Sequence, residues 1–326
     1  MGSINLKDMF PIEVTTHNLY FHEEASIFSM DTFNNFIATG GGDGIVRLWQ
    51  INDTEIKKEG DFVYTTALNS SIQLVYKSDL VGHTKAVNCV RFSYLGILAS
   101  SSDTGRVLLH FNDKTHVLRG SDELDCYELT WAKDTLYVGL SNGLIEEYQV
   151  LYDDNFYCKL VKSCFLHTDI IQGLAYNSKH FLLLSVSKDR TLKISQDDKM
   201  LDKINLNTNG RSFFRRTCFS KCNNMCFITN YKNSSILVLT YPFTEKHWIY
   251  KLGPFDSEIV KVIENNLLLF VLSKTSLYFY YNFNLLGCIE NICFKSVTDA
   301  TLYNNILFIS SLDGFIATFK WRVVGG

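Results

Sequence analysis

A short unit of two strands recurs along this chain of 326 residues, and the repeat limits the possible folds more than any other feature. Each copy has a strand-like run, a short polar turn and a second strand-like run that ends in an aromatic or bulky apolar residue. The clearest copy, residues 36–49, turns at the glycine-rich residues 40–44 and ends at Trp49. Seven copies span residues 36–49, 97–111, 136–148, 181–194, 225–239, 267–281 and 306–319.

A further strand-like segment precedes the copies. Residues 86–92 and 125–131 alternate apolar and polar side chains, as a strand packed on a core should, and residues 169–176 occupy the matching place in the fourth copy. No stretch has the long 3.6-residue apolar period of a helix. Four strands per copy, repeated seven times, predict an all-β, seven-bladed β-propeller in which each sheet packs on its neighbours.

The ends of the chain bear on how such a ring closes. The last copy supplies three strands and ends near Trp321, so we predict that residues 12–16 add the outer strand of the seventh blade. The chain is therefore predicted to be one propeller domain over residues 1–326, without a tail after it. Residues 52–76 are interpreted as an insert between blades 1 and 2, and a loop of that length in a compact domain is usually functional or disordered.

Composition excludes several classes of protein. Hydrophobic residues make up 46% and charged residues 20%, which is typical of a globular chain. A net charge of −3 disfavours a protein that coats nucleic acid by charge, and we expect no direct sequence-specific nucleic-acid binding. The longest apolar run, Leu267 to Leu272, is far shorter than the ~20 residues needed to span a bilayer, so no membrane is expected. Nine cysteines without a disulfide pattern fit a reducing compartment.

Possible sites of chemistry have simpler structural interpretations. Cys218, Cys222 and Cys226 are spaced by four, whereas zinc sites favour Cys-x2-Cys pairs, so no metal is predicted. The glycine-rich residues 40–44 precede no helix or Lys-Ser/Thr pair and are read as a hairpin turn, not a phosphate loop. No cofactor and no catalytic set of residues is predicted. The chain is therefore not expected to be an enzyme.

The copies resemble the repeats of WD-repeat propellers, although no Trp-Asp dipeptide occurs. In that family a His, a turn Asp and a blade-end Trp form a hydrogen-bonded set that braces each blade. The resemblance implies this role for Asp43, Trp49, His83, His167, Asp189 and Asp313. His110 and Ser195 stand at the Trp position in blades 2 and 4, so we expect these blades to depend more on apolar packing.

The order of several segments is similar to that in the middle, WD-repeat subunit of chromatin assembly factor 1, and in the related histone-regulator corepressors. These segments are residues 13–18, 27–31, 82–93, 118–120, 125–132, 171–173, 188–190, 211–216 and 312–314. The most distinctive is 211–216, which contains Phe-Phe-Arg-Arg, a run that a generic propeller does not need.

The resemblance implies a nuclear role in replication-coupled nucleosome assembly. The family's complex deposits the histone three–four pair on newly made DNA, and the middle subunit is a non-catalytic propeller that binds the large subunit. The small histone-binding WD-repeat subunit and core histones three and four would be met through the complex. Larger relatives carry a basic motif after the propeller that engages a second histone chaperone. Because this chain stops at Gly326, the resemblance leaves that contact open here.

A basic and aromatic cluster is the candidate partner-binding site, formed by Arg211, Phe213, Phe214, Arg215 and Arg216. Alternation along a strand would place Phe214 and Arg216 on one side and Phe213 and Arg215 on the other. At least one Arg must then lie near an apolar face and needs a carboxylate or carbonyl partner if buried. The cluster is either an anchor for an acidic segment of the large subunit or a structural brace between blades, and both remain open.

Two other functions remain open. The first is a subunit of a replication-independent, histone-regulator type of corepressor complex, which has the same fold. The second is a substrate adaptor of a ubiquitin ligase, which predicts an Arg-lined pocket on the top face for an acidic or phosphorylated segment. Recovery of the large partner by co-purification separates these alternatives.

Overall fold

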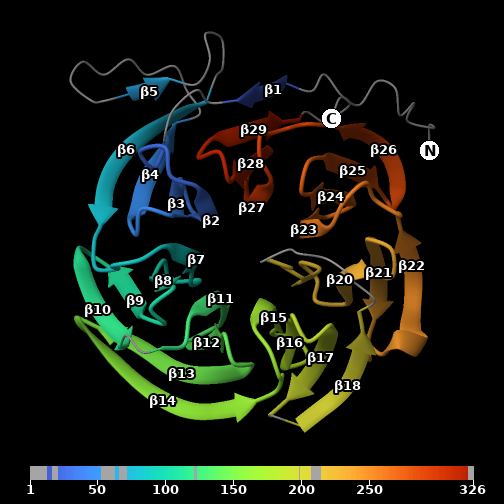
Figure 1. Cartoon of the computed structure of the whole chain (residues 1–326), viewed down its shortest axis with the longest axis horizontal. Coiled ribbons are helices and arrows are strands. Elements are labelled where there is room, and N and C mark those ends of the chain that lie inside the picture. Colours follow the sequence, from blue (N-terminus) through green and yellow to red (C-terminus); the bar gives the residue numbers. More distant parts are fainter. Residues whose placement is uncertain are drawn as a thin grey trace.

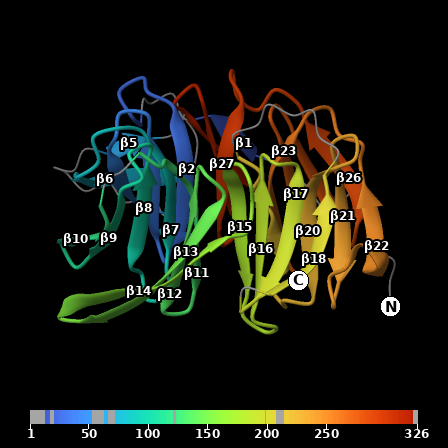
Figure 2. The same ribbon diagram turned by 60° about the horizontal axis from the view of Figure 1, so that its bottom comes forward.

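Seven antiparallel sheets surround a central channel in the computed structural model, which confirms the predicted all-β, seven-bladed propeller (Figure 1). The structure describes residues 13–16, 21–52, 63–65, 72–120, 123–197, 199–206 and 214–321. Over these residues the only helical element is a 3-10 turn, η2 (Glu245–His247). The strands stand along the channel, as Figure 2 shows from the side.

Each of the first four blades places its first strand beside the channel and its last strand at the rim. Blade 1 contains β2 (Ile27–Phe33), β3 (Phe36–Gly41), β4 (Val46–Asn52), β6 (Gln73–Leu80) and β5 (Val63–Thr65). Blade 2 contains β7 (Val87–Phe92), β8 (Leu98–Ser102), β9 (Val107–Phe111) and β10 (Lys114–Arg119). Blade 3 contains β11 (Cys126–Ala132), β12 (Thr135–Leu140), β13 (Leu144–Asp153) and β14 (Asn155–Phe165). Blade 4 contains β15 (Ile171–Asn177), β16 (Leu182–Ser187), β17 (Thr191–Gln196) and β18 (Lys199–Asn205).

The last three blades complete the ring. Blade 5 contains β19 (Cys218–Phe219), β20 (Met225–Tyr231), β21 (Ser235–Thr240) and β22 (Trp248–Leu252). Blade 6 contains β23 (Ile259–Asn265), β24 (Leu268–Ser273), β25 (Leu277–Tyr281) and β26 (Asn284–Ile289). Blade 7 contains β27 (Val297–Tyr303), β28 (Ile306–Ser311), β29 (Ile316–Lys320) and β1 (Glu13–Thr16).

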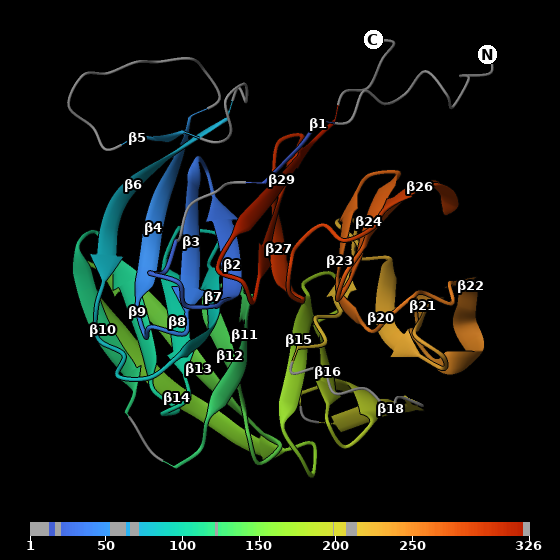
Figure 3. The same ribbon diagram turned by 45° about the horizontal axis from the view of Figure 1, so that its top comes forward.

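Blade 7 joins the two ends of the described chain. β1 pairs antiparallel with β29, from Glu13 opposite Lys320 to Thr16 opposite Ala317, and Figure 3 shows the two strands side by side. This confirms that an N-terminal strand supplies the outer strand of the last blade. Ile12, the first residue of the predicted segment, lies outside the described residues.

Of the expected insert at 52–76, the described residues 52, 63–65 and 73–76 belong to the sheet of blade 1. Its last residues begin the outer strand β6, in which Gln73 pairs with Asn52 and Tyr76 with Trp49. β5 then adds to the far edge of β6. The last residues of the expected insert therefore supply the start of the outer strand of blade 1, which the sequence spacing did not indicate.

The core is divided among the interfaces between neighbouring blades. Phe270 of blade 6 packs against Phe319 of blade 7, with ring centroids 6.0 Å apart, and Trp321 closes the same cluster. Between blades 2 and 3, the long hairpin of β13 and β14 reaches over the neighbouring sheet, with Tyr152 against Phe111 at 4.8 Å (Figure 2). Each sheet therefore buries its faces only when its neighbours are present.

Candidate functional site

A recurring irregularity in the innermost strands shapes one mouth of the channel. In six blades the second residue of the first strand is a β-bulge, which re-aims the side chains around it. Five of these bulge residues line a cavity of about 370 Å³, called the mouth cavity here: Phe28, Asn88, Tyr127, Val260 and Thr298. The sixth bulge residue is Gln172 of blade 4.

Blade 5 completes the wall of the mouth cavity with Phe214, which is buried. The rim carries Asp103 and Lys274, and both have partners within the molecule. The amide of Asn88 donates to Asp103 at 2.7 Å, and the ammonium of Lys274 lies 2.7 Å from Glu258. The mouth cavity is therefore an aromatic and aliphatic depression whose rim charges are hydrogen-bonded or paired within the molecule, a combination suited to an apolar side chain.

Below the mouth cavity lies a buried set of ion pairs, called the channel network here. It consists of Arg91, Glu128, Arg216, Lys261 and Asp299, one residue from each of blades 2, 3, 5, 6 and 7. Arg91 contacts Glu128 at 2.8 Å and Asp299 at 3.1 Å, and Lys261 contacts Asp299 at 2.7 Å. Burial alone would raise the pKa of Asp299, but the charges of Arg216, Lys261 and Arg91 outweigh it and hold that pKa far below its usual range.

Arg216 is the residue that connects this network most widely. Its Nε lies 3.0 Å from Glu128 and 3.5 Å from Asp299, and its Nη groups donate to the carbonyls of Thr298, Phe28 and Asn88. The guanidinium also lies over the Phe214 ring, 4.2 Å from the centroid. Removal of one partner from a buried ion pair leaves an unpaired charge inside the protein, which typically costs about 3–5 kcal/mol of folding free energy.

The structure separates the members of the predicted basic and aromatic cluster. Phe214 and Arg216 lie on one side, as alternation predicted, with Phe214 in the mouth cavity and Arg216 in the channel network. Arg215 points elsewhere and is also buried, and its N–H donates to the carbonyl of Gln172 at 2.9 Å. Burial lowers the pKa of Arg215, while Glu258 partly raises it. Arg211 and Phe213 lie outside the described residues.

These positions bear on the two roles left open for the cluster. Arg216 has the carboxylate and carbonyl partners that a buried Arg needs, which favours the brace between blades for this residue. Of the cluster's described members, Phe214 alone lines the mouth cavity. Binding of a partner by the cluster stays a prediction and now rests on Phe214.

In blade 1 the bracing set is complete. The imidazole of His22 lies 2.9 Å from Asp43 and 2.9 Å from Thr39, and the indole N–H of Trp49 donates to the same Thr39 hydroxyl at 3.1 Å. Arg47 adds a second contact to Asp43. Sequence reasoning identified Asp43 and Trp49 but missed His22, which precedes its Asp by 21 residues, close to the 22 that separate His167 from Asp189.

The other predicted bracing residues follow the same plan in part. In blade 4, His167 lies 2.9 Å from Asp189 and 2.8 Å from Ser185. In blade 2, His83 contacts two serine hydroxyls, and no carboxylate is among its hydrogen-bond partners within the described residues. In blade 7, Asp313 accepts hydrogen bonds from the N–H groups of Phe294, Lys295 and Phe315 and so stabilises two loops.

The remaining candidate chemistry can be placed as well. All three cysteines of the 218–226 run are free thiols, with Cys226 buried, Cys218 partly buried and Cys222 exposed. Within the described ranges, no three His, Cys, Asp or Glu side chains gather as metal ligands. In the same part of the chain, no helix is both long and apolar enough to cross a bilayer.

The fold and the comparison with protein families define the chain as a seven-bladed β-propeller that contains WD repeats. The family model described as "WD domain, G-beta repeat" matches residues 13–50, 72–110 and 158–194. These ranges include most of blade 1, most of blade 2 and the strands from β14 to β17.

More particularly, the chain is similar to subunits of chromatin assembly factor 1. It is 24% identical to one from Saccharomyces cerevisiae over 56% of this chain and 46% of the relative. It is 28% identical to the rice chromatin assembly factor 1 subunit FAS2 homolog over 55% of this chain and 35% of the relative. Protein HIR1 of Yarrowia lipolytica is 24% identical over 69% of this chain and 24% of the relative. The chain spans about half, or less, of the length of the curated relatives it matches.

Proposed function

We propose that this protein is the propeller subunit of a nuclear complex of the chromatin assembly factor 1 type. It would act as a non-catalytic scaffold while the complex deposits histones three and four behind the replication fork. One observation carries the proposal: the chain matches proteins named as subunits of chromatin assembly factor 1 from two yeasts, rice, chicken and mouse.

A scaffold role is consistent with the chemistry of the channel. Arg91, Arg216 and Lys261 are engaged with Glu128 and Asp299 inside the molecule. A catalytic centre would direct convergent polar groups at a cavity instead. The mouth cavity above them has a mainly apolar wall, which suits recognition of a protein side chain.

We place one contact of the large subunit at the mouth cavity, with Phe214 in its wall. Ala86 lies at the edge of the same cavity, so Ala86→Phe would fill it without removing an internal contact of the channel network. Ala86→Ser is the matched control because it adds only a hydroxyl group.

The test is reconstitution with the large and small subunits from the same organism. We expect the wild-type chain to co-elute with the large subunit and the resulting complex to assemble nucleosomes from histones three and four. Ala86→Phe should weaken large-subunit binding about tenfold, or about 1.4 kcal/mol, with an unchanged melting temperature. Full binding by Ala86→Phe would remove the mouth-cavity contact, whereas failure of the wild-type chain to bind would overturn the function itself.

The histone-regulator type of complex is the second candidate, because the HIR1 relative aligns over 69% of this chain, close to the 72% covered by the mouse chromatin assembly factor 1 relative. The same reconstitution with a histone-regulator partner distinguishes the two. We expect stronger binding to the large subunit of chromatin assembly factor 1, and the reverse preference would favour the second candidate.

A further inference from the structure

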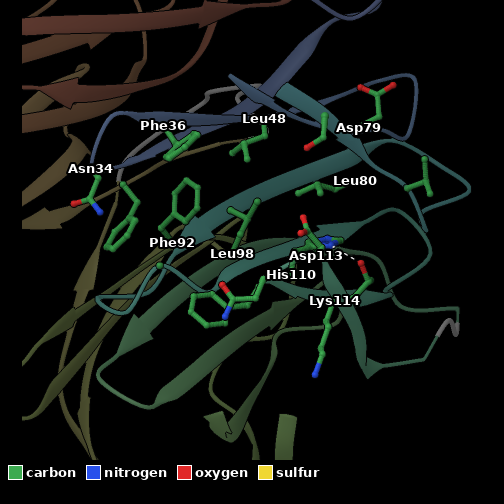
Figure 4. Close-up of a pocket in the computed structure, with 17 residues that line it drawn as sticks. Asn34, Phe36, Leu48, Asp79, Leu80, Phe92, Leu98, His110, Asp113 and Lys114 are labelled. Carbon is green, nitrogen blue, oxygen red and sulfur yellow. Dashed lines mark hydrogen bonds between the residues drawn. The ribbon is translucent and has the colours of Figure 1, made fainter. Parts of the chain in front are cut away.

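A second cavity lies away from the channel, between blades 1 and 2. It has a volume of about 610 Å³, and we call it the 1–2 groove. Its floor is apolar and comes from both sheets, as Figure 4 shows for all of these residues except Phe111. The floor residues are Phe36, Leu48 and Leu80 of blade 1 and Phe92, Leu98 and Phe111 of blade 2.

The groove exists because the two blades pack tightly only near the channel. The fully buried cluster between them consists of the small side chains Ala38, Val46, Val87 and Val90, with Leu98 at its edge. Leu48, Leu80 and Phe92 pack against that cluster but stay partly exposed. Val81, next to Leu80 in the lining, is 68% exposed. Apolar surface held open in this way gains about 25 cal/mol per Å² when another molecule covers it.

The charged groups around the groove are mainly acidic. Asp79 and Asp113 both line it. Among the described lining residues the one lysine is Lys114, which donates to the backbone carbonyl of Asp154 in blade 3. Its side chain points away from Phe92 and Leu98 in Figure 4.

The nearby side chains of His110 and Arg47 add little positive charge to the groove. Burial lowers the pKa of His110 to about 4, so this imidazole is neutral at neutral pH. Arg47 contacts Asp79 at 3.3 Å but is shared with Asp43. The groove thus combines an apolar floor with an excess of negative charge at its edge.

We infer that the 1–2 groove binds an extended segment of the large subunit that carries a bulky apolar side chain beside a lysine or arginine. The inference rests on the proposed function, because it takes its partner from there. The apolar side chain would cover Leu48, Leu80 and Phe92, and the basic side chain would pair with Asp113 and Asp79. A single segment fits better than a folded domain, because the cavity is of the size that encloses a few side chains.

Two exposed positions allow the groove to be altered without disturbing the core. Val81→Glu places a charge beside the apolar side chain of Leu80. Asp113→Asn removes the carboxylate from the turn, and Asn tolerates the φ of +59° that this residue adopts. The matched controls are Leu285→Glu, at a side chain that is 56% exposed on blade 6, and Asp197→Asn, at an exposed turn residue of blade 4 with a φ of +45°.

Binding of the purified large subunit is then measured by titration at two salt concentrations. We expect the Val81→Glu, Asp113→Asn protein to bind at least tenfold more weakly than wild type, and both controls to bind within twofold of it. Asp113→Asn alone should bind with a weaker salt dependence, since it removes one ion pair. Equal binding by wild type and the groove variant overturns the groove assignment and leaves the proposed function intact. No binding by wild type overturns the proposed function, and this inference with it.

Crosslinking identifies the occupant directly. A photo-crosslinking amino acid at position 81, with one at position 285 as control, should capture a large-subunit peptide in which a bulky apolar residue is adjacent to a basic one. Crosslinking to a second copy of this chain, with a dimer mass in light scattering, would overturn the inference in favour of self-association. Crosslinking to a peptide without a basic residue would overturn the charge argument.

Discussion

At the scale of single residues, blade 2 replaces a charged brace with a neutral one. His83 lies 2.8 Å from the hydroxyl of Ser100, which is itself 3.1 Å from His110, and the second nitrogen of His83 lies 3.0 Å from Ser102. In blades 1 and 4 the equivalent His faces an aspartate. Burial, together with repulsion from His110 and Arg106, lowers the pKa of His83 to about 3, and no carboxylate among its described hydrogen-bond partners opposes the shift.

This arrangement predicts a pH dependence of stability. The pKa of His83 is about 3 when folded and about 6.5 when unfolded, so between these values the unfolded chain binds more protons. The contribution of His83 is complete above about pH 6.5 and falls as the pH drops toward 3. At its steepest the loss is about 1.4 kcal/mol per pH unit for one group.

His83→Gln should therefore lose less stability than wild type between pH 7 and pH 5, measured as the free energy of unfolding in urea. Thr104→Ala is the control, because Thr104 contacts Ser102 of the same polar set at 2.9 Å but does not titrate. A pH slope in His83→Gln equal to that of wild type would contradict the neutral brace.

At the scale of elements, the entry into blade 5 differs from that of every other blade. Its innermost strand, β19, has two residues, and the residues before it bond to the neighbouring blades. Arg215 donates to Gln172 of blade 4 at 2.9 Å, and Arg216 donates to Val260 of blade 6 at 3.0 Å. Arg216 also forms an isolated parallel bridge with Lys261. This segment holds Arg216 in the channel network and Phe214 in the mouth cavity.

Gly173 makes that close approach possible. A Cβ at this position would clash with the backbone carbonyl oxygen of Arg215, which cannot move without disturbing Arg216. Gly173→Ala should cost on the order of 2 kcal/mol of unfolding free energy, as over-packing of a tight interior does. Gly120→Ala, where a Cβ meets no atom within 4 Å, is the control and should leave stability near that of wild type. Equal stability of the two variants, measured by urea unfolding, would show that blades 4 and 5 are not closely packed here.

The same segment shows which features can be predicted from sequence patterns and which cannot. The two-strand copies and the turn residues Asp43 and Asp189 are local signals, because a strand, a turn and its bracing His lie within about 25 residues. The channel network is not local, since Glu128 and Arg216 are 88 residues apart and nothing in either neighbourhood specifies the partner. The 1–2 groove could not be predicted from the sequence either, because it depends on the distance between two sheets at their outer edges.

At the scale of the whole molecule, two devices hold the ring together. The channel network joins blades that are not neighbours, as when Arg91 of blade 2 contacts Asp299 of blade 7. The second device is the pairing of β1 with β29, which joins the start of the chain to its last blade. Without β1, the edge of β29 would expose unpaired N–H and C=O groups, a template for association with other strands.

Deletion of residues 1–16 should therefore lower the melting temperature sharply and promote self-association. The double substitution Val14→Pro, Thr15→Pro tests the same strand pairing without a deletion. Because consecutive N–H groups in a strand face opposite sides, one of the two prolines must remove a hydrogen-bond donor to β29. Each lost hydrogen bond costs about 1 kcal/mol, so the deletion should remove several kcal/mol and the double substitution less.

Deletion of residues 1–12 spares β1 and serves as the control. Thermal unfolding followed by circular dichroism, with light scattering for association, checks both effects, and a melting temperature for the 1–16 deletion equal to that of the control would contradict closure by β1.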